Sequence, residues 1–386
     1  MLDYFIGPER PIRWVLQFWP VLVCSFVFAL LATALCKKIA LKFGIVDRPD
    51  DHVKTHKGTV AYLGGVGILI GVIAGILAGI YCFLGRGHPP STLLWLFGVL
   101  TGGAVVCFVG LVDDLFDLKP YQKMLGQIVA AMVLVAVGIR PSFSFLHAYL
   151  GWNVSENIEM ILGIPVVILF VLGATNSLNL LDGLDGLCAG VTVIMSMALL
   201  LLAIHLGTWA SSNVGGDSVR VIVCLGLLGA VCGFLPFNRH PAKIFMGDAG
   251  SMLLGFFVAA LMILFAEKAV RWWMASVVVF GLPILDTVVA LIRRLMNHRP
   301  LFVSDRGHIY DQMIDRGIPL KKTVALCYAL AALYALIGLA LSLRIQIRAR
   351  YALVIYVLVF ALSGIIVWKK GYLKMDGLRG AVHKKS

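Results

Sequence analysis

Apolar segments alternate with short polar connections along most of the 386-residue chain. A helix needs roughly 18 predominantly apolar residues to cross the ~30 Å hydrocarbon core of a bilayer. Eleven segments fit this requirement approximately, at residues 14–36, 60–84, 93–112, 122–139, 158–176, 187–207, 220–236, 251–266, 272–292, 323–343 and 351–368. Because unpaired backbone groups are costly in lipid, the pattern predicts an all-α, polytopic membrane protein with about 10–11 transmembrane helices. We expect neighbouring helices to shelter the shortest segment, 251–266.

The composition supports this class of protein. Hydrophobic residues make up 60% of the chain and charged residues 14%, which is more apolar surface than a soluble fold of this length can bury. The first apolar segment is too long for a signal-peptide core and lacks a small-residue cleavage site, so we expect it to be retained. The sequence therefore predicts one integral membrane domain, residues 1–368, and a basic cytoplasmic tail, residues 369–386. All eight cysteines lie in or beside apolar segments and indicate packing rather than a disulfide framework.

Basic residues are distributed unequally between the two sides of the membrane. Of the 33 Lys and Arg residues, 23 fall in connections on one side and 10 on the other. The positive-inside rule predicts that the first side is cytoplasmic, with the N-terminus outside and the C-terminus in the cytoplasm, in a cell (inner or plasma) membrane. This topology explains the net charge of +13 and requires no nucleic-acid partner.

Topology does not explain the acidic residues. Fourteen of the 20 acidic residues lie on the predicted cytoplasmic side, and all fourteen are aspartates: Asp47, Asp50, Asp51, Asp113, Asp114, Asp117, Asp182, Asp185, Asp248, Asp286, Asp305, Asp311, Asp315 and Asp376. Short carboxylates gathered with basic residues suit metal and phosphate chemistry better than solvation.

The segment GLVDDLFDLKPYQK carries three of these acids at the end of an apolar helix. Helical spacing allows Asp113, Asp114 and Asp117 to converge on a small volume. Such a group requires a cation or a proton among the carboxylates, and Lys123 follows within reach.

The segment NSLNLLDGLDGL carries two amides and two carboxylates at steps of three residues. One face of a single helical segment can present all four side chains, Asn176, Asn179, Asp182 and Asp185. Interleaved glycines weaken the helix and permit a close approach of backbone or ligand. Ordinary caps and turns explain one Asp and one Gly but not the repeated DGLDG.

Three other polar segments are ambiguous alone. In the loop at residues 46–65, Lys54 and its basic neighbours suit either a phosphate or anionic lipid. The segment FNRHPAKIFMGDAGS ends in a sequence that a simple helix cap would also explain. The basic loop at residues 293–317 is long enough to cover a site, and its His308 is either a proton donor, a phosphate ligand or merely solvated.

Taken in order, VDDLFD, NSLNLLDGLDGL, FNRHPAKIFMGDAGS and the GG after the first loop resemble the motifs of the polyprenyl-phosphate N-acetylhexosamine-1-phosphate transferases, glycosyltransferase family 4. This family includes phospho-MurNAc-pentapeptide translocase and the UDP-GlcNAc:undecaprenyl-phosphate GlcNAc-1-phosphate transferases. The resemblance covers residues 14–343. It implies an all-helical enzyme with a cytoplasmic site and one Mg²⁺, acting as a homodimer among membrane lipids at the first membrane step of envelope polysaccharide synthesis. The implied substrates are a UDP-N-acetylhexosamine and a polyprenyl phosphate, with UMP released.

The resemblance also implies roles for individual residues. Asp248 corresponds to the magnesium ligand, and Phe245 to an aromatic residue that stacks on uracil. Asp113 and Asp114 correspond to paired acids that act on the lipid phosphate, with His308 a further catalytic candidate. The substrate-binding candidates are Lys54, Asn179, Asp182, Asp185, Asn238, Phe245 and Arg306.

The sequence departs from the family pattern in two places. Where the family has HxHH, the chain reads His308, Ile309, Tyr310 and Asp311, which shifts the expected phosphate contacts toward Arg306 and Arg316. The first loop has Ala61 where the GlcNAc-1-phosphate branch commonly has Pro. The loop spacing of KTHKGTVAYLGG still favours GlcNAc as the sugar, with other N-acetylated hexoses open.

Three other classes of protein compete with this interpretation. A prenyl-diphosphate-using transferase would also use a DDxxD motif, and it would release pyrophosphate rather than UMP. A secondary transporter would place its polar residues in broken helices near the midplane and show internal repeats. A structural membrane scaffold would leave the one-sided carboxylates unexplained.

Overall fold

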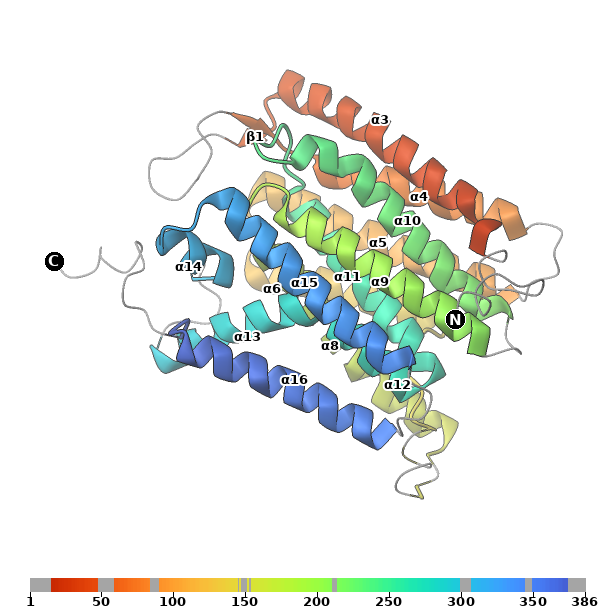
Figure 1. The fold of residues 1–386 in the computed structure, drawn as a ribbon. Coiled ribbons are helices and arrows are strands. Elements are labelled where there is room, and N and C mark those ends of the chain that lie inside the picture. The colour runs from red at the N-terminus through yellow and green to blue at the C-terminus, as the bar shows by residue number, and fades with distance from the viewer. Residues whose placement is uncertain are drawn as a thin grey trace.

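The computed structural model is a bundle of long helices that run side by side (Figure 1). It describes residues 15–47, 59–83, 90–144, 146, 151–152, 154–209, 214–298, 307–343 and 349–373. The first half of the chain forms α3 (Trp19–Phe43), β1 (Val46–Asp47), β2 (Val60–Ala61), α4 (Gly64–Phe83), α5 (Pro90–Phe116), α6 (Pro120–Ala136) and α8 (Glu156–Leu181). The second half forms α9 (Leu187–Trp209), α10 (Val214–Asn238), α11 (Gly247–Lys268), α12 (Val270–Val279), α13 (Gly281–Met296), α14 (Ile309–Asp315), α15 (Leu320–Leu343) and α16 (Ala349–Lys369).

The predicted all-α, multi-pass membrane architecture is confirmed. Within the described residues, eight helices are long and apolar enough to cross a membrane, and the bent pair of α12 and α13 makes up to nine. The remaining two predicted segments fall on α6, which has 17 residues, and on α16. All eleven predicted apolar segments therefore correspond to helices.

The span formed by α12 and α13 bends by 69° between its two helices. Pro283 lies in the first turn of α13, and its ring nitrogen cannot donate the hydrogen bond that would continue α12. This bend brings the far end of α13 to the end of the bundle that also carries β1 and α14 (Figure 1).

Helix α11 is the centre of the bundle. The whole of its apolar stretch is buried, as expected for the segment 251–266. Close packing depends on glycine at two crossings: a Cβ on Gly110 of α5 would lie 2.5 Å from the Ala249 backbone nitrogen, and a Cβ on Gly255 would collide with the backbone of Thr175 in α8. The first residues of α11 are therefore fixed against the ends of α5 and α8.

A small β-structure secures the connection between α10 and α11. Strands β1 and β2 pair antiparallel, and Ala61 of β2 forms a parallel bridge with Ile244. The Phe245 N–H donates to the Ala61 carbonyl at 2.8 Å, and the Gly64 N–H donates to the Phe245 carbonyl at 3.0 Å. The segment that enters α11 is thus held by backbone bonds from the first loop. All eight cysteines are free, in agreement with the expectation of no disulfide framework.

Candidate active site

The polar segments singled out in the sequence meet at the end of the bundle that carries β1 and α14 (Figure 1). We call this the β1 end. Its components are the last turn of α5, the first turn of α6, the end of α8 and the start of α11. These elements are far apart in the chain, so the site exists only in the folded protein.

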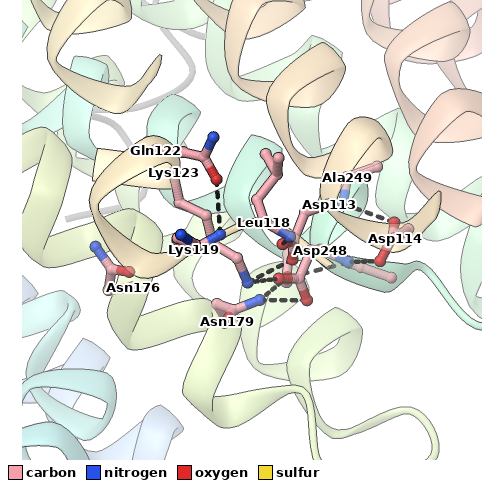
Figure 2. Close-up of polar contacts among 12 residues, drawn as sticks. Asp113, Asp114, Leu118, Lys119, Gln122, Lys123, Asn176, Asn179, Asp248 and Ala249 are labelled. Atoms are coloured by element: carbon pink, nitrogen blue, oxygen red, sulfur yellow. Dashed lines mark hydrogen bonds and ion pairs between the residues drawn. The ribbon is translucent and has the colours of Figure 1, made fainter. Parts of the chain in front are cut away.

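Lys123 joins two of the expected carboxylates. Its Nζ lies 2.7 Å from Asp248 Oδ2 and also forms an ion pair with Asp113 Oδ2 (Figure 2). The other Asp248 oxygen accepts a hydrogen bond from Asn179 Nδ2 at 2.8 Å, and the same amide donates to Ser251 Oγ at 3.0 Å. We call Asp113, Lys123, Asn179 and Asp248 the carboxylate–lysine cluster. It carries two negative charges and one positive charge in a partly buried setting, where charges interact more strongly than in water.

Asp114 faces the start of α11 rather than the carboxylate–lysine cluster. Its Oδ1 accepts the Asp248 N–H at 2.8 Å, and its Oδ2 accepts the Ala249 N–H at 3.1 Å (Figure 2). The first N–H groups of a helix have no partner within the helix, so the Asp114 carboxylate caps α11 from another helix. Asp113 and Asp114 are adjacent in sequence, yet they hold different partners.

The expected single helical face at residues 176–185 is only partly correct. Helix α8 ends at Leu181, and Asp182 is its C-cap. Asn176 and Asn179 lie on α8, where Asn176 Nδ2 donates to Gln127 Oε1 of α6 at 2.9 Å. The chain then turns through residues 182–186, which we call the 182–186 turn, before α9 begins. The repeated glycines end the helix here, so Asp182 and Asp185 do not share a helical face with Asn176 and Asn179.

Asp185 is occupied by the connection between α10 and α11. Its Oδ2 lies 2.7 Å from His240 Nδ1 and accepts the Ala242 N–H at 3.0 Å. Asn238, 2% exposed, also links the two segments: it accepts the Gly186 N–H at 3.1 Å and donates to the Ile244 carbonyl at 3.2 Å. Asp185 and Asn238 therefore stabilise the walls of the site, and both remain predicted contacts for the substrate.

Asp182 differs from the other acids of the site. Among the described residues, no hydrogen-bond donor contacts its side chain. Burial raises the pKa of its carboxyl well above the ordinary value, and the charges of Asp248 and Asp114 raise it further. An acceptor without a partner beside other carboxylates is the position at which a donor from a ligand would be most stabilising.

Phe245 lies half-buried on the strand-like segment before α11. Its ring meets the Tyr62 ring edge-on, with centroids 6.0 Å apart. The family resemblance predicts that Phe245 stacks on uracil, and Tyr62 adds a second aromatic ring from the first loop.

His308 is buried at the start of α14, with 5% of its surface exposed. Its Nδ1 lies 2.7 Å from Asp286 Oδ2 of α13, and Asp286 Oδ1 accepts the Ile309 N–H at 2.6 Å. The His308 ring also stacks on the Tyr310 ring, with centroids 5.5 Å apart. Asp286 thus fixes both the imidazole and the first turn of α14.

Asp117, expected beside the other two acids of its motif, is exposed after α5 with a left-handed backbone (φ 51°). Lys54 and Arg306 lie outside the described residues.

The site also contains residues that sequence reasoning did not assign, chiefly Asp286 and Gln127. In the sequence, Asp286 is one of the fourteen one-sided aspartates and lies within the apolar segment 272–292. An acid within an apolar segment is costly unless paired, and that feature was the available signal.

The site's oxygen donors match the chemistry of a hard divalent cation. Among the described residues, no group of three or more His, Cys, Asp or Glu side chains is arranged to enclose a metal ion. Mg²⁺ is usually bound through one or two carboxylates, with waters and substrate phosphates completing the shell. Asp248 and Asp113, which share a single lysine as counter-charge, fit that mode of binding.

The fold and the site together define a multi-pass membrane protein with a carboxylate-rich polar centre at the ends of its helices. Comparison with known proteins gives the family: residues 96–266 match the model of glycosyl transferase family 4. The chain belongs to this family, since it also matches curated relatives of it over most of its length.

Three relatives illustrate the match. The chain is 31% identical over 341 residues to a probable undecaprenyl-phosphate N-acetylglucosaminyl 1-phosphate transferase of Bacillus subtilis (strain 168), covering 86% of each chain. It is 30% identical to a decaprenyl-phosphate N-acetylglucosaminephosphotransferase of Mycobacterium tuberculosis (strain ATCC 25618 / H37Rv), covering 87% of this chain and 85% of the relative. It is 26% identical to an undecaprenyl-phosphate alpha-N-acetylglucosaminyl 1-phosphate transferase of Escherichia coli (strain K12), covering 90% of this chain and 91% of the relative.

Proposed function

We propose that this protein transfers N-acetylglucosamine 1-phosphate from UDP-GlcNAc to a polyprenyl phosphate such as undecaprenyl phosphate. An oxygen of the lipid phosphate attacks the sugar-bearing phosphorus of UDP-GlcNAc. A new phosphoanhydride bond forms there, the old one breaks, and UMP leaves with the bridging oxygen. The product is polyprenyl-diphospho-GlcNAc, the lipid carrier from which an envelope polysaccharide such as lipopolysaccharide or teichoic acid is built.

One structural observation carries this proposal: the carboxylate–lysine cluster lies at the end of a membrane-spanning bundle, beside a turn with an open acceptor. A water-soluble nucleotide sugar and a lipid phosphate can meet only at such an interface. The relatives named above support the choice of reaction, because their names specify transfer of N-acetylglucosamine phosphate to prenyl phosphates of two kinds.

The reaction brings two anionic phosphates together, so charge control is the main task of the site. Asp248 and Asp113 would hold a Mg²⁺ ion, which when bound neutralises the charge that develops on the departing UMP. Lys123 supplies a fixed positive charge between the two carboxylates. Asn179 orients Asp248 through the 2.8 Å hydrogen bond.

The lipid phosphate is already anionic near neutral pH, so it needs positioning more than deprotonation. Asp114 is suited to positioning, because it fixes the backbone of Asp248. Asp182 is the residue best placed to accept a hydrogen bond from the nucleoside, and Phe245 with Tyr62 provides an aromatic surface for the uracil ring. Lys54, Arg306 and His308 are proposed to complete the phosphate-binding side.

The charge asymmetry of the sequence supports a cytoplasmic position for the β1 end in a plasma or inner membrane. UDP-sugars are cytoplasmic metabolites, which requires the same orientation. We also propose that the protein acts as a homodimer within the membrane, as its family resemblance implies.

An assay of UMP release tests the reaction directly. Purified protein would be offered undecaprenyl phosphate and Mg²⁺ with UDP-GlcNAc, UDP-GalNAc or UDP-MurNAc-pentapeptide in parallel. We expect UMP from UDP-GlcNAc, with less from the other two donors. No UMP from any donor would overturn the transferase proposal, and preference for another donor would overturn the choice of sugar.

The structure argues against a prenyl-diphosphate-using transferase. That chemistry needs the three acids of DDxxD to act together, whereas Asp117 is exposed and Asp114 faces the start of α11. Release of pyrophosphate instead of UMP would restore that alternative.

A further inference from the structure

Two tyrosine hydroxyls, from α14 and α15, hold the chain on either side of Asp182 at the 182–186 turn. Tyr310 of α14 donates to the Leu180 carbonyl at 2.8 Å, and Tyr328 of α15 donates to the Gly186 carbonyl at 2.6 Å. These carbonyls lie on the two sides of Asp182. Leu180 is among the last residues of α8, whose carbonyls have no partner within the helix.

Both rings pack against glycines. A Cβ on Gly183 would collide with the Tyr310 ring, and a Cβ on Gly190 would collide with the Tyr328 ring. Part of the glycine content of the segment DGLDGLCAG is therefore explained by the two aromatic rings rather than by backbone conformation. Gly186, at φ 76°, is the position that needs a left-handed backbone.

The other connections of this turn are also satisfied. Asp185 is bound by His240 and Ala242, and the Gly186 N–H is bound by Asn238. Asp182 is the acid of the turn that receives no donor from the described residues. The turn is fixed on both sides, and the Asp182 carboxyl group remains available to accept a hydrogen bond. Asp182 is therefore preorganised to bind a ligand.

We propose that Tyr310 and Tyr328 are positioning residues that set Asp182 as the hydrogen-bond acceptor for the nucleotide part of the sugar donor. This inference rests on the proposed function. It also gives Tyr310, which stands at the third position of the segment where the family has HxHH, a role that does not involve the diphosphate. The hydroxyl binds the end of α8 instead.

Replacement of either tyrosine by Phe keeps the ring in place and removes only the hydroxyl. We expect Y310F and Y328F each to raise the KM for UDP-GlcNAc about fivefold or more, because a loosened turn must be ordered on binding. The kcat and the KM for undecaprenyl phosphate should stay within about twofold of the wild type. Calorimetric titration with UMP should show the same loss in affinity.

Tyr334→Phe is the matched control. Tyr334 also lies on α15, and its hydroxyl donates to Ser363 Oγ at 2.6 Å, away from the β1 end. The Y334F variant also loses one tyrosine hydrogen bond, so we expect its thermal stability to fall by about as much as that of Y328F. Its KM for UDP-GlcNAc should not change.

A double-mutant cycle with Asp182→Asn tests the connection to Asp182. If the tyrosine acts through Asp182, the effects of Y310F and D182N on the KM should be strongly non-additive. Additive effects would overturn the proposal. So would an unchanged KM for UDP-GlcNAc, or an equal loss in kcat and in both KM values, which would indicate a general structural role.

Gly190→Ala provides a second approach from the opposite side of the contact, with Gly226→Ala as its control. A Cβ on Gly190 displaces Tyr328, whereas a Cβ on the buried Gly226 of α10 meets its nearest atom only at 3.7 Å. G190A should raise the KM for UDP-GlcNAc, and G226A should not. Failure of the wild type to release UMP would defeat the proposed function, whereas an active wild type with unaffected variants would defeat this inference alone.

Discussion

Asp114 caps the helix that carries Asp248: its carboxylate accepts the Asp248 N–H at 2.8 Å. Two acids that the sequence separates by more than a hundred residues are thus joined by a hydrogen bond from the backbone of one to the side chain of the other. The relationship gives Asp114 a positioning role and leaves Asp248 with its side chain directed to Lys123 and Asn179.

Asp114→Ala should lower stability and turnover together. Loss of both cap bonds should cost about 1–2 kcal/mol of unfolding free energy, and the displaced Asp248 should reduce UMP release. Asp114→Asn keeps one acceptor and should recover most of the stability. Thermal unfolding and UMP release measured on the same samples check this. A folded, fully stable D114A protein without turnover would instead indicate that Asp114 is the general base.

Lys123→Met should reduce UMP release by about 100-fold or more, because a preorganised charge is removed from between Asp113 and Asp248. Lys123→Arg should retain part of the activity. Lys119→Met is the matched control, since Lys119 is an exposed lysine at the N-cap of α6, the helix that carries Lys123. Equal rates for K123M and K119M would show that the lysine bridge has no role in turnover.

The raised pKa of the Asp182 carboxyl predicts how the stability of the protein depends on pH. Because the pKa of its carboxyl is raised above the ordinary 3.8 in the folded protein, the folded state binds the proton more tightly than the unfolded state. This contribution to stability is present in acid and is lost as the pH rises from that ordinary value through the raised pKa. Asp182→Asn should therefore gain stability relative to the wild type as the pH increases. A difference in Tm that is constant with pH would contradict the shift.

Removal of divalent cations should abolish UMP release, and added Mg²⁺ should restore it. The expectation follows from the two carboxylates that share one lysine. Asp248→Asn should weaken binding of Mn²⁺, followed by electron paramagnetic resonance, whereas Asp315→Asn should leave it unchanged. Full activity in the presence of a strong chelator would exclude the proposed metal requirement.

Asp286→Ala should destabilise the protein by about 2–4 kcal/mol, because it leaves the buried His308 side chain and the Ile309 N–H without their acceptor. Asp315→Ala, in the last turn of α14, the helix that Asp286 of α13 contacts, should cost within about 0.5 kcal/mol. Denaturation followed by tryptophan fluorescence compares the two. Similar stabilities would show that the contact between α13 and α14 contributes little.

The sequence determined the class of membrane protein, the places of eleven apolar segments and the gathering of polar segments at one end. Hydrophobic length and charge asymmetry are properties of local composition, so they can be recognised without coordinates. Helical spacing singled out Asp113 and Asn179, and the family resemblance singled out Asp248. The structure brings all three together with Lys123.

Only the tertiary structure decided what each polar group does. Helical spacing would place Asp117 beside its acidic neighbours and Asp185 on the same face as Asn179. Neither arrangement occurs, because α5 ends before Asp117 and α8 ends before Asp185. Asp114, Asn238 and Asp185 are bound to backbone groups of distant segments, and Asp286 is bound to His308. These contacts depend on how helices from separate parts of the chain pack against one another. The local sequence around each residue does not specify that packing.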